Sequence, residues 1–453
     1  MDMRDKRFLV MGTGKSGIAA AGLLVGQHIA VTLYDGNDGL DKEVFYGKNP
    51  ALKEVTLICG TLPENVIDGT DILVLSPGVP PDLPVVQKMR DAGIEIWGEI
   101  ELAYVFSKGK LLAITGTNGK TTTTALLGEI LEHYYSDVKV VGNIGIPYTS
   151  IADQTTDGTV TVAEISSFQL ETAHTFAPEV TAILNITPDH LDRHHTMENY
   201  IAVKESITKN QREDDLCVLN YEDEALRRFG EGLKTKVTWF SGMRELKDGF
   251  FFKDGVIFVS RNNEQKELVK TEELNLLGLH NYENVMAAAA MADGFGVPLA
   301  KIREVLLHFQ AVEHRIEYVT EKRGVRFYND SKGTNPDAAV KGICAMTRPT
   351  YLIGGGYDKN ASYDTWIQAF GGKVKELVLI GQTREKIREA AIACGFTAVT
   401  LADSLEEAVD ICYRQAVSGD AVLLSPACAS WGMFVDYEER GRKFKEIVNQ
   451  LKE

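Results

Sequence analysis

The most constraining feature of the sequence is a short glycine-rich loop between an apolar segment and a helical one. The apolar run Leu111–Thr115 predicts a buried strand, and the loop Gly116–Thr122 follows it directly. Glycines let backbone N–H groups point at phosphate oxygens, and a helix beginning there adds the positive end of its dipole. Lys120 adds a charge for the β- and γ-phosphates, and the Thr121 hydroxyl can bind Mg²⁺. The loop therefore predicts a nucleotide phosphate site, although it is two residues shorter between its glycines than the common P-loop pattern.

Apolar runs and helical stretches alternate along the whole chain of 453 residues, which is long enough for about three domains. The predicted strands are Arg7–Met11, Ala30–Tyr34, Ile72–Leu75, Leu111–Thr115, Val160–Ala163, Val180–Asn185, Val325–Tyr328, Thr350–Ile353, Glu376–Ile380 and Ala421–Leu424. The predicted helices are Ser16–Val25, one from the loop to about Tyr135, Met197–Gln211 and two within 281–308, and a hairpin is predicted over Gly249–Ser260. This alternation predicts an α/β fold of three consecutive domains, residues 1–99, 100–313 and 314–453, with parallel sheets and crossover helices.

The composition is typical of a folded protein with an acidic surface. Hydrophobic residues make up 44%, charged residues 25%, and the formal net charge is -16. Such a surface repels nucleic-acid backbones, so we expect no nucleic-acid partner. The chain shows neither a signal-peptide core nor an apolar run of membrane-spanning length, so we expect a cytoplasmic protein without a membrane partner. The six cysteines form no CxxC pair, which is typical of free thiols in a reducing compartment.

A second glycine-rich turn follows the first predicted strand. Gly12–Gly17 fits the G-x-G-x-x-G pattern, and Asp35 ends the next strand about 20 residues later. In a dehydrogenase these glycines would admit a dinucleotide pyrophosphate, and the acid would hold a ribose hydroxyl. A tight turn that merely needs glycine, or a site for a different diphosphate nucleotide, also fits this pattern.

Two polar stretches follow strands downstream of the phosphate loop. Glu164 comes directly after the apolar run Val160–Ala163, where a metal-binding carboxylate of an ATPase would lie. The segment Thr187–His195 follows the next predicted strand and contains three histidines and two aspartates. It can be interpreted as a metal site, zinc included, or as a polar turn whose histidines only form hydrogen bonds.

Three motifs in this order resemble the Mur ligase family. They are the loop Gly116–Thr122, the segment Glu164–Glu171 (Glu-Ile-Ser-Ser-Phe-Gln-Leu-Glu) and the segment Asp189–Asp192 (Asp-His-Leu-Asp). The resemblance implies an ATP-dependent, amide-forming ligase of peptidoglycan precursor synthesis. Two further stretches, Tyr328–Pro336 and Ser425–Ser430, resemble the branch of the family that adds D-glutamate. That branch commonly has phenylalanine where Tyr437 stands, so the aromatic ring is kept.

The resemblance assigns an ATP site and two Mg²⁺ ions to the central domain. Lys120 would hold the phosphates, with Thr121 and Glu164 on one ion. His190 and an N-carboxylated Lys204 would hold the second ion, because a carbamate turns a lysine into an oxygen ligand. The residues implied for the nucleotide are Gly116, Thr117, Asn118, Gly119, Lys120, Thr121, Thr122, Asn284, Arg315 and Asp330. Lys120, His190 and Lys204 would be the catalytic residues.

In the same family the first domain binds the UDP part of the sugar substrate, so the turn Gly12–Gly17 would be a substrate clamp. The resemblance implies UDP-N-acetylmuramoyl-L-alanine and D-glutamate as substrates, and a Rossmann-like fold for the first and third domains. The residues implied for the sugar nucleotide are Ser16, Asp35, Gly36, Ser76, Pro77, Gly78, Asn143 and Ser166. Those implied for D-glutamate are Lys332, Thr334, Lys359, Ser430 and Tyr437.

Three other functions fit part of the sequence. A nicotinamide-dependent oxidoreductase would use the turn Gly12–Gly17 but leaves the phosphate loop unexplained. A related ligase could use another amino acid or a folate, and a nucleotide switch could bind ATP without turnover. No long apolar heptad pattern indicates a coiled-coil dimer, so we expect a monomer.

Overall fold

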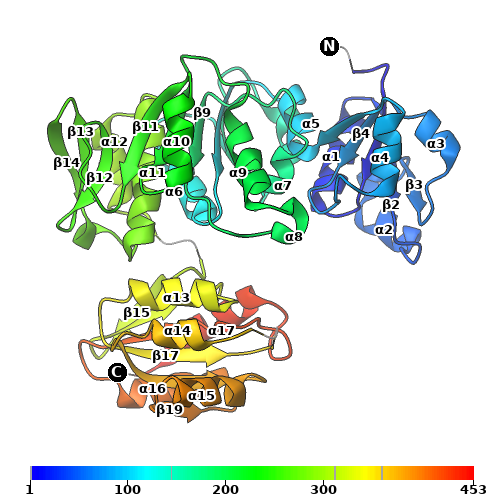
Figure 1. Ribbon diagram of the computed structural model, residues 1–453. Coiled ribbons are helices and arrows are strands. Elements are labelled where there is room, and N and C mark those ends of the chain that lie inside the picture. Colours follow the sequence, from blue (N-terminus) through cyan, green and yellow to red (C-terminus); the bar gives the residue numbers. More distant parts are fainter. Residues whose placement is uncertain (1–2, 144, 311–312, 359–360, 453) are drawn as a thin grey trace. The chain divides into compact units, whose positions relative to one another are not determined.

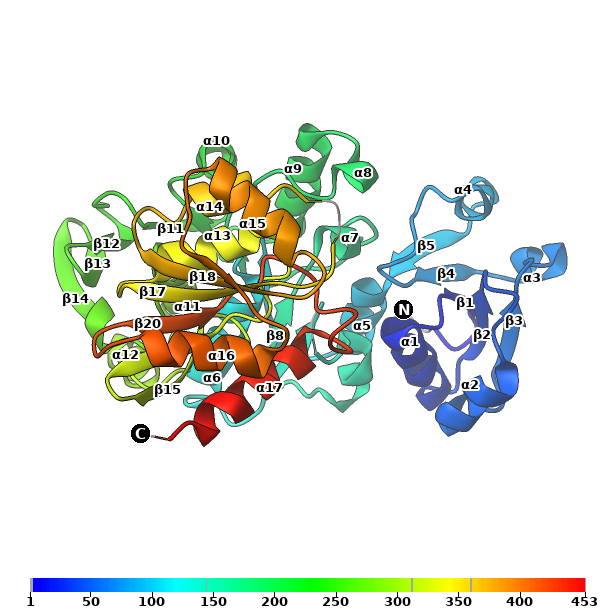
Figure 2. The ribbon, with the colours of Figure 1, turned by 90° about the horizontal axis from the view of Figure 1, so that it is seen from below.

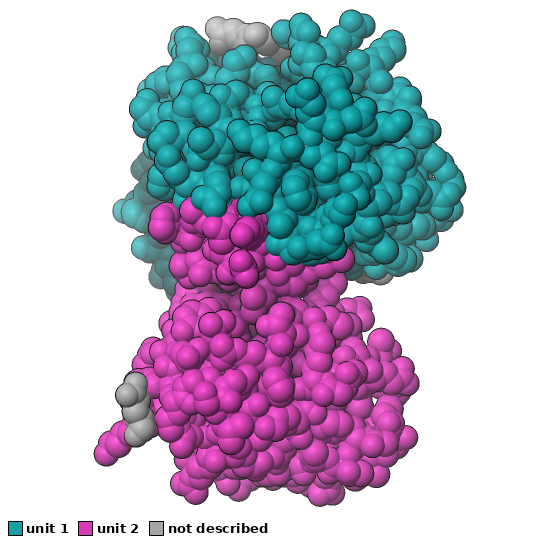
Figure 3. Space-filling model, turned by 90° about the vertical axis from the view of Figure 1, so that its left-hand side faces the viewer, with its two compact units in different colours: residues 1–268, 283–306 teal, residues 269–282, 307–453 magenta. Residues whose placement is uncertain are grey.

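The computed structural model describes residues 3–143, 145–310, 313–358 and 361–452, without the side chain of residue 192. Its contacts divide the chain into two compact units (Figure 3). The first comprises residues 1–268 and 283–306, and the second comprises residues 269–282 and 307–453. Among the described residues, no helix combines the length and apolarity needed to cross a membrane.

The N-terminal domain, blue in Figure 1, is a parallel five-stranded sheet with the order β3-β2-β1-β4-β5, which Figure 2 shows. Its strands are β1 (Arg7–Met11), β2 (Ala30–Asp35), β3 (Thr56–Cys59), β4 (Ile72–Leu75) and β5 (Glu95–Gly98). Its helices are α1 (Lys15–Gly26), α2 (Lys42–Lys48), α3 (Glu64–Asp68) and α4 (Pro84–Asp91), with a 3₁₀ turn at Pro50–Leu52. Apolar side chains of α1 pack on one face of the sheet, and those of α3 and α4 pack on the other. Because strand order reverses between β1 and β4, the turns after these two strands form the natural ligand crevice.

The central domain is a nine-stranded sheet with the order β14-β13-β12-β11-β10-β9-β6-β8-β7. Its strands are β6 (Lys110–Thr115), β7 (Val138–Gly142), β8 (Val160–Glu164), β9 (Val180–Ile183), β10 (Leu216–Asn220), β11 (Lys236–Ser241), β12 (Gly249–Lys253), β13 (Val256–Arg261) and β14 (Glu264–Lys270). Its helices are α5 (Glu99–Phe106), α6 (Lys120–Glu132), α7 (Ser167–Leu170), α8 (Leu191–His194), α9 (Met197–Glu205), α10 (Glu224–Gly232), α11 (Leu279–Gly294) and α12 (Leu299–Leu306). Short 3₁₀ turns lie at Tyr148–Ser150, Ala152–Gln154, Ser206–Thr208 and Thr271–Glu273. The strands from β7 to β12 pair in parallel, so the loops after β6, β8 and β9 meet at one edge.

The hairpin predicted over Gly249–Ser260 is confirmed, because β12 and β13 pair antiparallel around a turn at Asp254 and Gly255, both with positive φ. The helix predicted over Met197–Gln211 is too long. Helix α9 ends at Glu205, and the side chains of Ser206 and Thr208 then bond back to preceding carbonyls, which offers the backbone an alternative to the helix. The helix after the loop likewise ends at Glu132.

The C-terminal domain is a six-stranded sheet with the order β15-β16-β20-β17-β18-β19. Its strands are β15 (Glu317–Lys322), β16 (Val325–Asn329), β17 (Thr350–Gly355), β18 (Val374–Ile380), β19 (Val399–Leu401) and β20 (Ala421–Leu424). Its helices are α13 (Pro336–Ala345), α14 (Asp364–Gln368), α15 (Arg384–Ala393), α16 (Leu405–Gln415) and α17 (Tyr437–Gln450). Helices α13 to α15 pack on one face of the sheet, and α16 and α17 pack on the other (Figure 2). Three mixed α/β domains therefore follow one another along the chain, as predicted.

Candidate active site

The predicted phosphate loop connects β6 to α6 in a strained, glycine-dependent conformation. Gly116 has φ 146° and Gly119 has φ 88°, and residues that carry a side chain rarely adopt these φ values. A Cβ at Gly119 would lie 2.2 Å from Oδ1 of Asn284, so the loop and α11 are in direct contact. Gly119, the N-cap of helix α6, has no side chain to cap the helix, and the first N–H groups of any α-helix lack an intrahelical acceptor. Such groups at a helix start form an anion site.

The segment after β9 holds the loop in place. Asn118 N donates to Oδ1 of Asn185 at 2.9 Å, and Nδ2 of Asn185 returns a bond to the Asn118 carbonyl at 3.1 Å. The Thr117 hydroxyl lies 3.1 Å from both the Thr187 carbonyl and the Tyr200 hydroxyl. Sequence reasoning missed Asn185 and Tyr200; the position of Asn185 just after a buried strand was the only signal for it. These bonds preorganise the loop rather than leave it to close around a ligand.

Two lysines converge on one carbonyl of the loop. Lys120 Nζ donates to the Gly116 carbonyl at 2.9 Å and to the Thr117 carbonyl at 3.0 Å. Lys204 Nζ, from α9, donates to the same Gly116 carbonyl at 2.8 Å and lies over the Tyr200 ring. Lys204 is only 1% exposed, and burial, followed by the charge of Lys120, lowers the pKa of Lys204 to about 7. A large fraction of this amine is therefore neutral at physiological pH.

Glu164 ends β8 beside the loop. The register pairs Ile114 with Glu164, so this carboxylate lies at the same edge of the sheet as the loop. It is 2% exposed and accepts a hydrogen bond from Nδ2 of Asn143 at 3.1 Å. Ser166 caps α7 in a capping box with Gln169. The fold thus brings the predicted residues Asn143, Glu164 and Ser166 together.

His190 is the N-cap of the one-turn helix α8 and has φ 51°, in the left-handed region. Its half-exposed ring lies 4.8 Å from the Phe168 ring, and its Nε2 lies 3.5 Å from an Asp189 oxygen. His194 is buried instead, with Nε2 3.0 Å from the Ser167 hydroxyl. Among the described side chains, no three His, Cys, Asp or Glu groups gather as a ready metal site.

The turns after β1, β2 and β4 meet in the N-terminal domain. Asp35 accepts hydrogen bonds from Thr13 and from Asn37 N. Burial acts to raise the pKa of Asp35, but these hydrogen bonds prevail and leave it below its usual value. The Ser76 hydroxyl is buried without a hydrogen-bond partner in the described chain, and a Cβ at Gly12 would lie 2.8 Å from it. A buried hydroxyl without a partner is rare in folded proteins, which marks this turn as a candidate contact for a ligand. The other predicted residues of this region, Ser16, Gly36, Pro77 and Gly78, lie on these turns or, for Ser16, in the first turn of α1.

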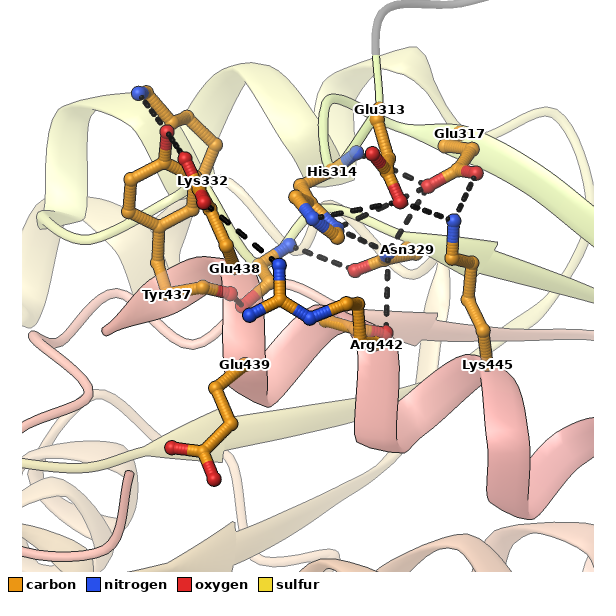
Figure 4. A network of polar contacts seen from close by, with 12 residues as sticks. Glu313, His314, Glu317, Asn329, Lys332, Tyr437, Glu438, Glu439, Arg442 and Lys445 are labelled. Atoms are coloured by element: carbon orange, nitrogen blue, oxygen red, sulfur yellow. Dashed lines mark hydrogen bonds and ion pairs between the residues drawn. The ribbon is translucent and has the colours of Figure 1, made fainter. Parts of the chain in front are cut away.

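In the C-terminal domain, Lys332 and Tyr437 form a contact at the start of α17 (Figure 4). Lys332 Nζ lies 2.6 Å from the Tyr437 hydroxyl and 3.9 Å from its ring centroid, and that hydroxyl donates to Glu438. Thr334 N donates to the Lys332 carbonyl at 2.7 Å. Ser430 is buried, and Lys359 lies outside the described residues.

Asp330 lies at the end of β16, fully buried, and accepts a 2.6 Å hydrogen bond from the Ser425 hydroxyl. Burial raises the pKa of Asp330 to about 7, although this hydrogen bond and the charge of Arg315 act in the opposite direction. A polar network that sequence reasoning missed also lies here (Figure 4). In it, Asn329 Nδ2 lies 2.9 Å from His314 Nδ1, and Lys445 bridges Glu313 and Glu317.

A cavity of about 620 Å³ lies at the other end of β6, where the strand begins. Trp97, Tyr104 and Tyr148 line it, and the Glu101 carboxylate at its wall accepts hydrogen bonds from the backbone of 174–176. None of the predicted site residues is among those that line it in the described structure. This cavity is therefore separate from the phosphate loop.

Replacing Gly119 with alanine is expected to weaken nucleotide binding strongly and to cost about 1–3 kcal/mol of stability. The new Cβ would meet Asn284 Oδ1 at 2.2 Å, on a backbone that disfavours a side chain. Calorimetric titration with ADP and a thermal melt measure the two effects. Gly145→Ala is the matched control, because Gly145 also has positive φ but has open space around its Cβ position. Unchanged ADP binding in Gly119→Ala would contradict the assignment of the loop.

A preorganised phosphate loop on a parallel sheet, with a buried carboxylate and a second lysine beside it, defines a nucleotide-binding enzyme of the P-loop type. Comparison with known proteins narrows this class. Three family models match: the Mur ligase MurD-like N-terminal domain at residues 6–98, the Mur ligase middle domain at 114–292, and the Mur ligase glutamate ligase domain at 314–428.

Two relatives that match along the whole chain carry the same name. UDP-N-acetylmuramoylalanine–D-glutamate ligases of Lachnoclostridium phytofermentans and Lachnospira eligens are each 54% identical to this chain, with all of both chains covered. Among solved structures, the UDP-N-acetylmuramate-alanine ligase of Thermotoga maritima matches with a TM-score of 0.60 at 19% identity, covering 99% of this chain and 100% of that one. The MurF ligase of the same organism, solved in complex with ADP, matches at 0.58 and 17%, with 99% of both chains covered. The chain belongs to the Mur ligase family of ATP-dependent, amide-forming ligases.

Proposed function

We propose that the protein joins D-glutamate to UDP-N-acetylmuramoyl-L-alanine, with conversion of ATP to ADP and phosphate, in peptidoglycan precursor synthesis. The observation that carries the proposal is the 54% identity, along the whole chain, to relatives named for this reaction. The loop geometry supports the ATP half, because it combines the N-terminus of a helix, the Lys120 ammonium and two glycines with positive φ. We place the reaction in the cytoplasm and propose a monomer with domains at 1–99, 100–313 and 314–453.

The residues around the loop fit a nucleotide with Mg²⁺. We assign Lys120 to the ATP phosphates and Asn284, Arg315 and Asp330 to the rest of the nucleotide. Thr121 and Glu164 would hold one Mg²⁺, since both offer hard oxygen ligands. When bound, this metal neutralises the crowded phosphate charges.

A second Mg²⁺ would lie between His190 and Lys204. A protonated lysine repels a cation, whereas a carbamate offers it a carboxylate. A carbamate forms when a neutral amine adds to CO₂ with loss of a proton. The buried Lys204 amine, with its pKa of about 7, supplies the neutral form that this addition needs.

The sugar nucleotide would occupy the crevice of the N-terminal domain. Asp35 and Gly36 would face uracil, and the unpaired Ser76 hydroxyl and the start of α1 would face the diphosphate. Asn143 and Ser166 would then lie along the muramoyl-alanine arm. For D-glutamate we assign Lys332, Thr334, Lys359, Ser430 and Tyr437, because a dicarboxylate needs cationic partners.

The reaction proceeds in two displacements. The alanine carboxylate oxygen attacks the γ-phosphorus of ATP, the bond to the bridging oxygen breaks, and an acyl phosphate and ADP result. The D-glutamate amine then attacks the acyl carbon, loses a proton and expels phosphate, which leaves an amide. Lys120 stabilises the charge on the transferred phosphoryl group, and the helix N–H groups of the loop orient it.

The test is phosphate release with UDP-N-acetylmuramoyl-L-alanine and one amino acid at a time. We expect release with D-glutamate, and a rate at least about 100-fold lower with L-glutamate, L-lysine or meso-diaminopimelate. A chain that turns over only with one of the other acceptors belongs to another branch of the family. One that binds ATP but never turns over is a nucleotide switch.

A further inference from the structure

The Arg193 side chain connects the His190 segment to the sugar-nucleotide crevice. Arg193 lies on α8, three residues after His190, and its guanidinium reaches the turn Ser76–Val79 that follows β4. We propose that Arg193 is a positioning residue for the sugar-nucleotide substrate, acting through this turn and through α8. The inference rests on the proposed function, because it takes the N-terminal crevice to be the sugar-nucleotide site.

The guanidinium makes directed contacts on both sides. Its Nε donates to Oε1 of Glu171 at 3.3 Å and its Nη2 donates to Oε2 at 2.6 Å, in a two-point contact. Its Nη1 donates to the Pro77 carbonyl at 2.9 Å, and Nη2 also contacts the Val79 carbonyl at 3.5 Å. The group lies 4.0 Å over the Phe168 ring. Arg193 and Glu171 are 14% and 13% exposed, so solvent screens this pair far less than a surface pair.

Because protein acceptors occupy most of these N–H groups, Arg193 is poorly placed to bind a phosphate itself. A diphosphate would have to break the contact with Glu171 or with the turn before it could take those donors. The side chain therefore acts on the substrate indirectly. Arg193 contributes to substrate binding by fixing the positions of the turn Ser76–Val79 and of helix α8.

On the crevice side, Arg193 fixes the direction of Ser76. The turn is closed by Val79 N donating to the Ser76 carbonyl at 2.9 Å, and Ser76 N donates to the Met11 carbonyl at 3.0 Å. The Ser76 hydroxyl faces the turn at Gly12, buried and without a partner in the described structure. Arg193 binds the Pro77 and Val79 carbonyls, so it fixes the backbone of the turn that carries this hydroxyl.

Arg193 also stabilises the short helix α8, which follows the proposed catalytic residue His190. Helix α8 has four residues, and both residues that flank it, His190 at φ 51° and His195 at φ 66°, adopt left-handed backbone. One isolated helical turn is unstable alone, so the contact with Glu171 anchors α8. The Arg193 side chain thus fixes two elements of the proposed substrate site. One is the turn Ser76–Val79, where we place the diphosphate, and the other is helix α8, which follows His190.

Calorimetric titrations of the full chain with UDP-N-acetylmuramoyl-L-alanine, and separately with ADP and Mg²⁺, test the role. Arg193→Met keeps an unbranched apolar side chain but removes every donor, and Arg193→Lys restores the charge and part of the bonding. We expect Arg193→Met to weaken sugar-nucleotide binding by about ten-fold or more while ADP affinity changes less than about two-fold, and Arg193→Lys to recover part of the loss.

Arg244→Met is the matched control. Arg244 makes the same two-point contact with Glu222, and it lies 5.5 Å from the Tyr221 ring centroid, but it follows β11 in the sheet. We expect its replacement to leave both affinities unchanged. Unchanged sugar-nucleotide binding in Arg193→Met overturns the inference. An equal loss of affinity for the sugar nucleotide and for ADP also overturns it, because such a loss indicates that Arg193 only stabilises the fold. A wild-type chain that binds no sugar nucleotide overturns the proposed function, and with it this inference; that outcome is recognised without any variant.

Discussion

Replacing Lys120 with alanine is expected to reduce phosphate release by on the order of 10²–10³-fold while leaving the fold intact. The Lys120 ammonium lies within 3.0 Å of two loop carbonyls, at the start of α6 where the phosphates would bind. Removing it deletes the charge that would balance the transferred phosphoryl group. A cation at a helix N-terminus opposes the helix dipole, so its loss costs little stability. We expect the free energy of unfolding to change by less than about 0.5 kcal/mol.

The measurement is phosphate release under saturating substrates, together with a thermal melt of each variant. Lys110→Ala is the control. Lys110 begins β6, the strand that leads into the phosphate loop, and its half-exposed ammonium pairs with Glu179 at 3.1 Å. This control should retain wild-type turnover. A Lys120→Ala enzyme within about three-fold of the wild-type rate, with an unchanged melt, would falsify the catalytic role of the lysine.

Three of the strands predicted from the sequence are buried along almost their whole length. β1, β4 and β6 are continuous apolar runs bounded by glycine-rich or Ser-Pro-Gly turns, so their existence is encoded locally. β14 was missed because its sequence, Glu264–Lys270, is mostly polar and exposed, as suits the edge of a sheet. The strand order is not local either. β6 lies between β8 and β9, and only packing of the whole domain determines this.

The residues of the candidate site also divide into those that the local sequence indicates and those that only the folded structure brings together. Loop glycines and a lysine at a helix start are visible in a few consecutive residues, because local backbone geometry demands them. Lys204 is separated from its partner Gly116 by 88 residues and looks like a surface lysine on its own helix. Only the family resemblance singled it out. The fold supplies the physical reason, which is nearly complete burial beside a second lysine.

Lys204→Ala is expected to lower turnover by on the order of 10³-fold, because it removes both the proposed metal ligand and its carbamate. Lys204→Arg should be no better, since a guanidinium keeps the charge but cannot become a carbamate. We expect a short carboxylate such as acetate, which can replace the carbamate as an oxygen ligand, to restore part of the rate of Lys204→Ala. Lys209→Ala is the control and should stay active. Lys209 follows α9 and the 3₁₀ turn Ser206–Thr208, and its ammonium donates to the Ala173 carbonyl.

The pH dependence of wild-type turnover tests the carbamate itself. The pKa of Lys204 is lowered from 10.5 to about 7, so the amine becomes protonated as the pH falls through 7. Only the neutral amine adds to CO₂, so activity at fixed CO₂ should fall below that pH. Added bicarbonate should then raise the activity of the wild type but not that of Lys204→Arg. ¹³C-labelled bicarbonate should give a carbamate NMR signal in the wild type alone. A bicarbonate response of equal size in Lys204→Arg, or a signal that persists in that variant, would show that another group carries the effect.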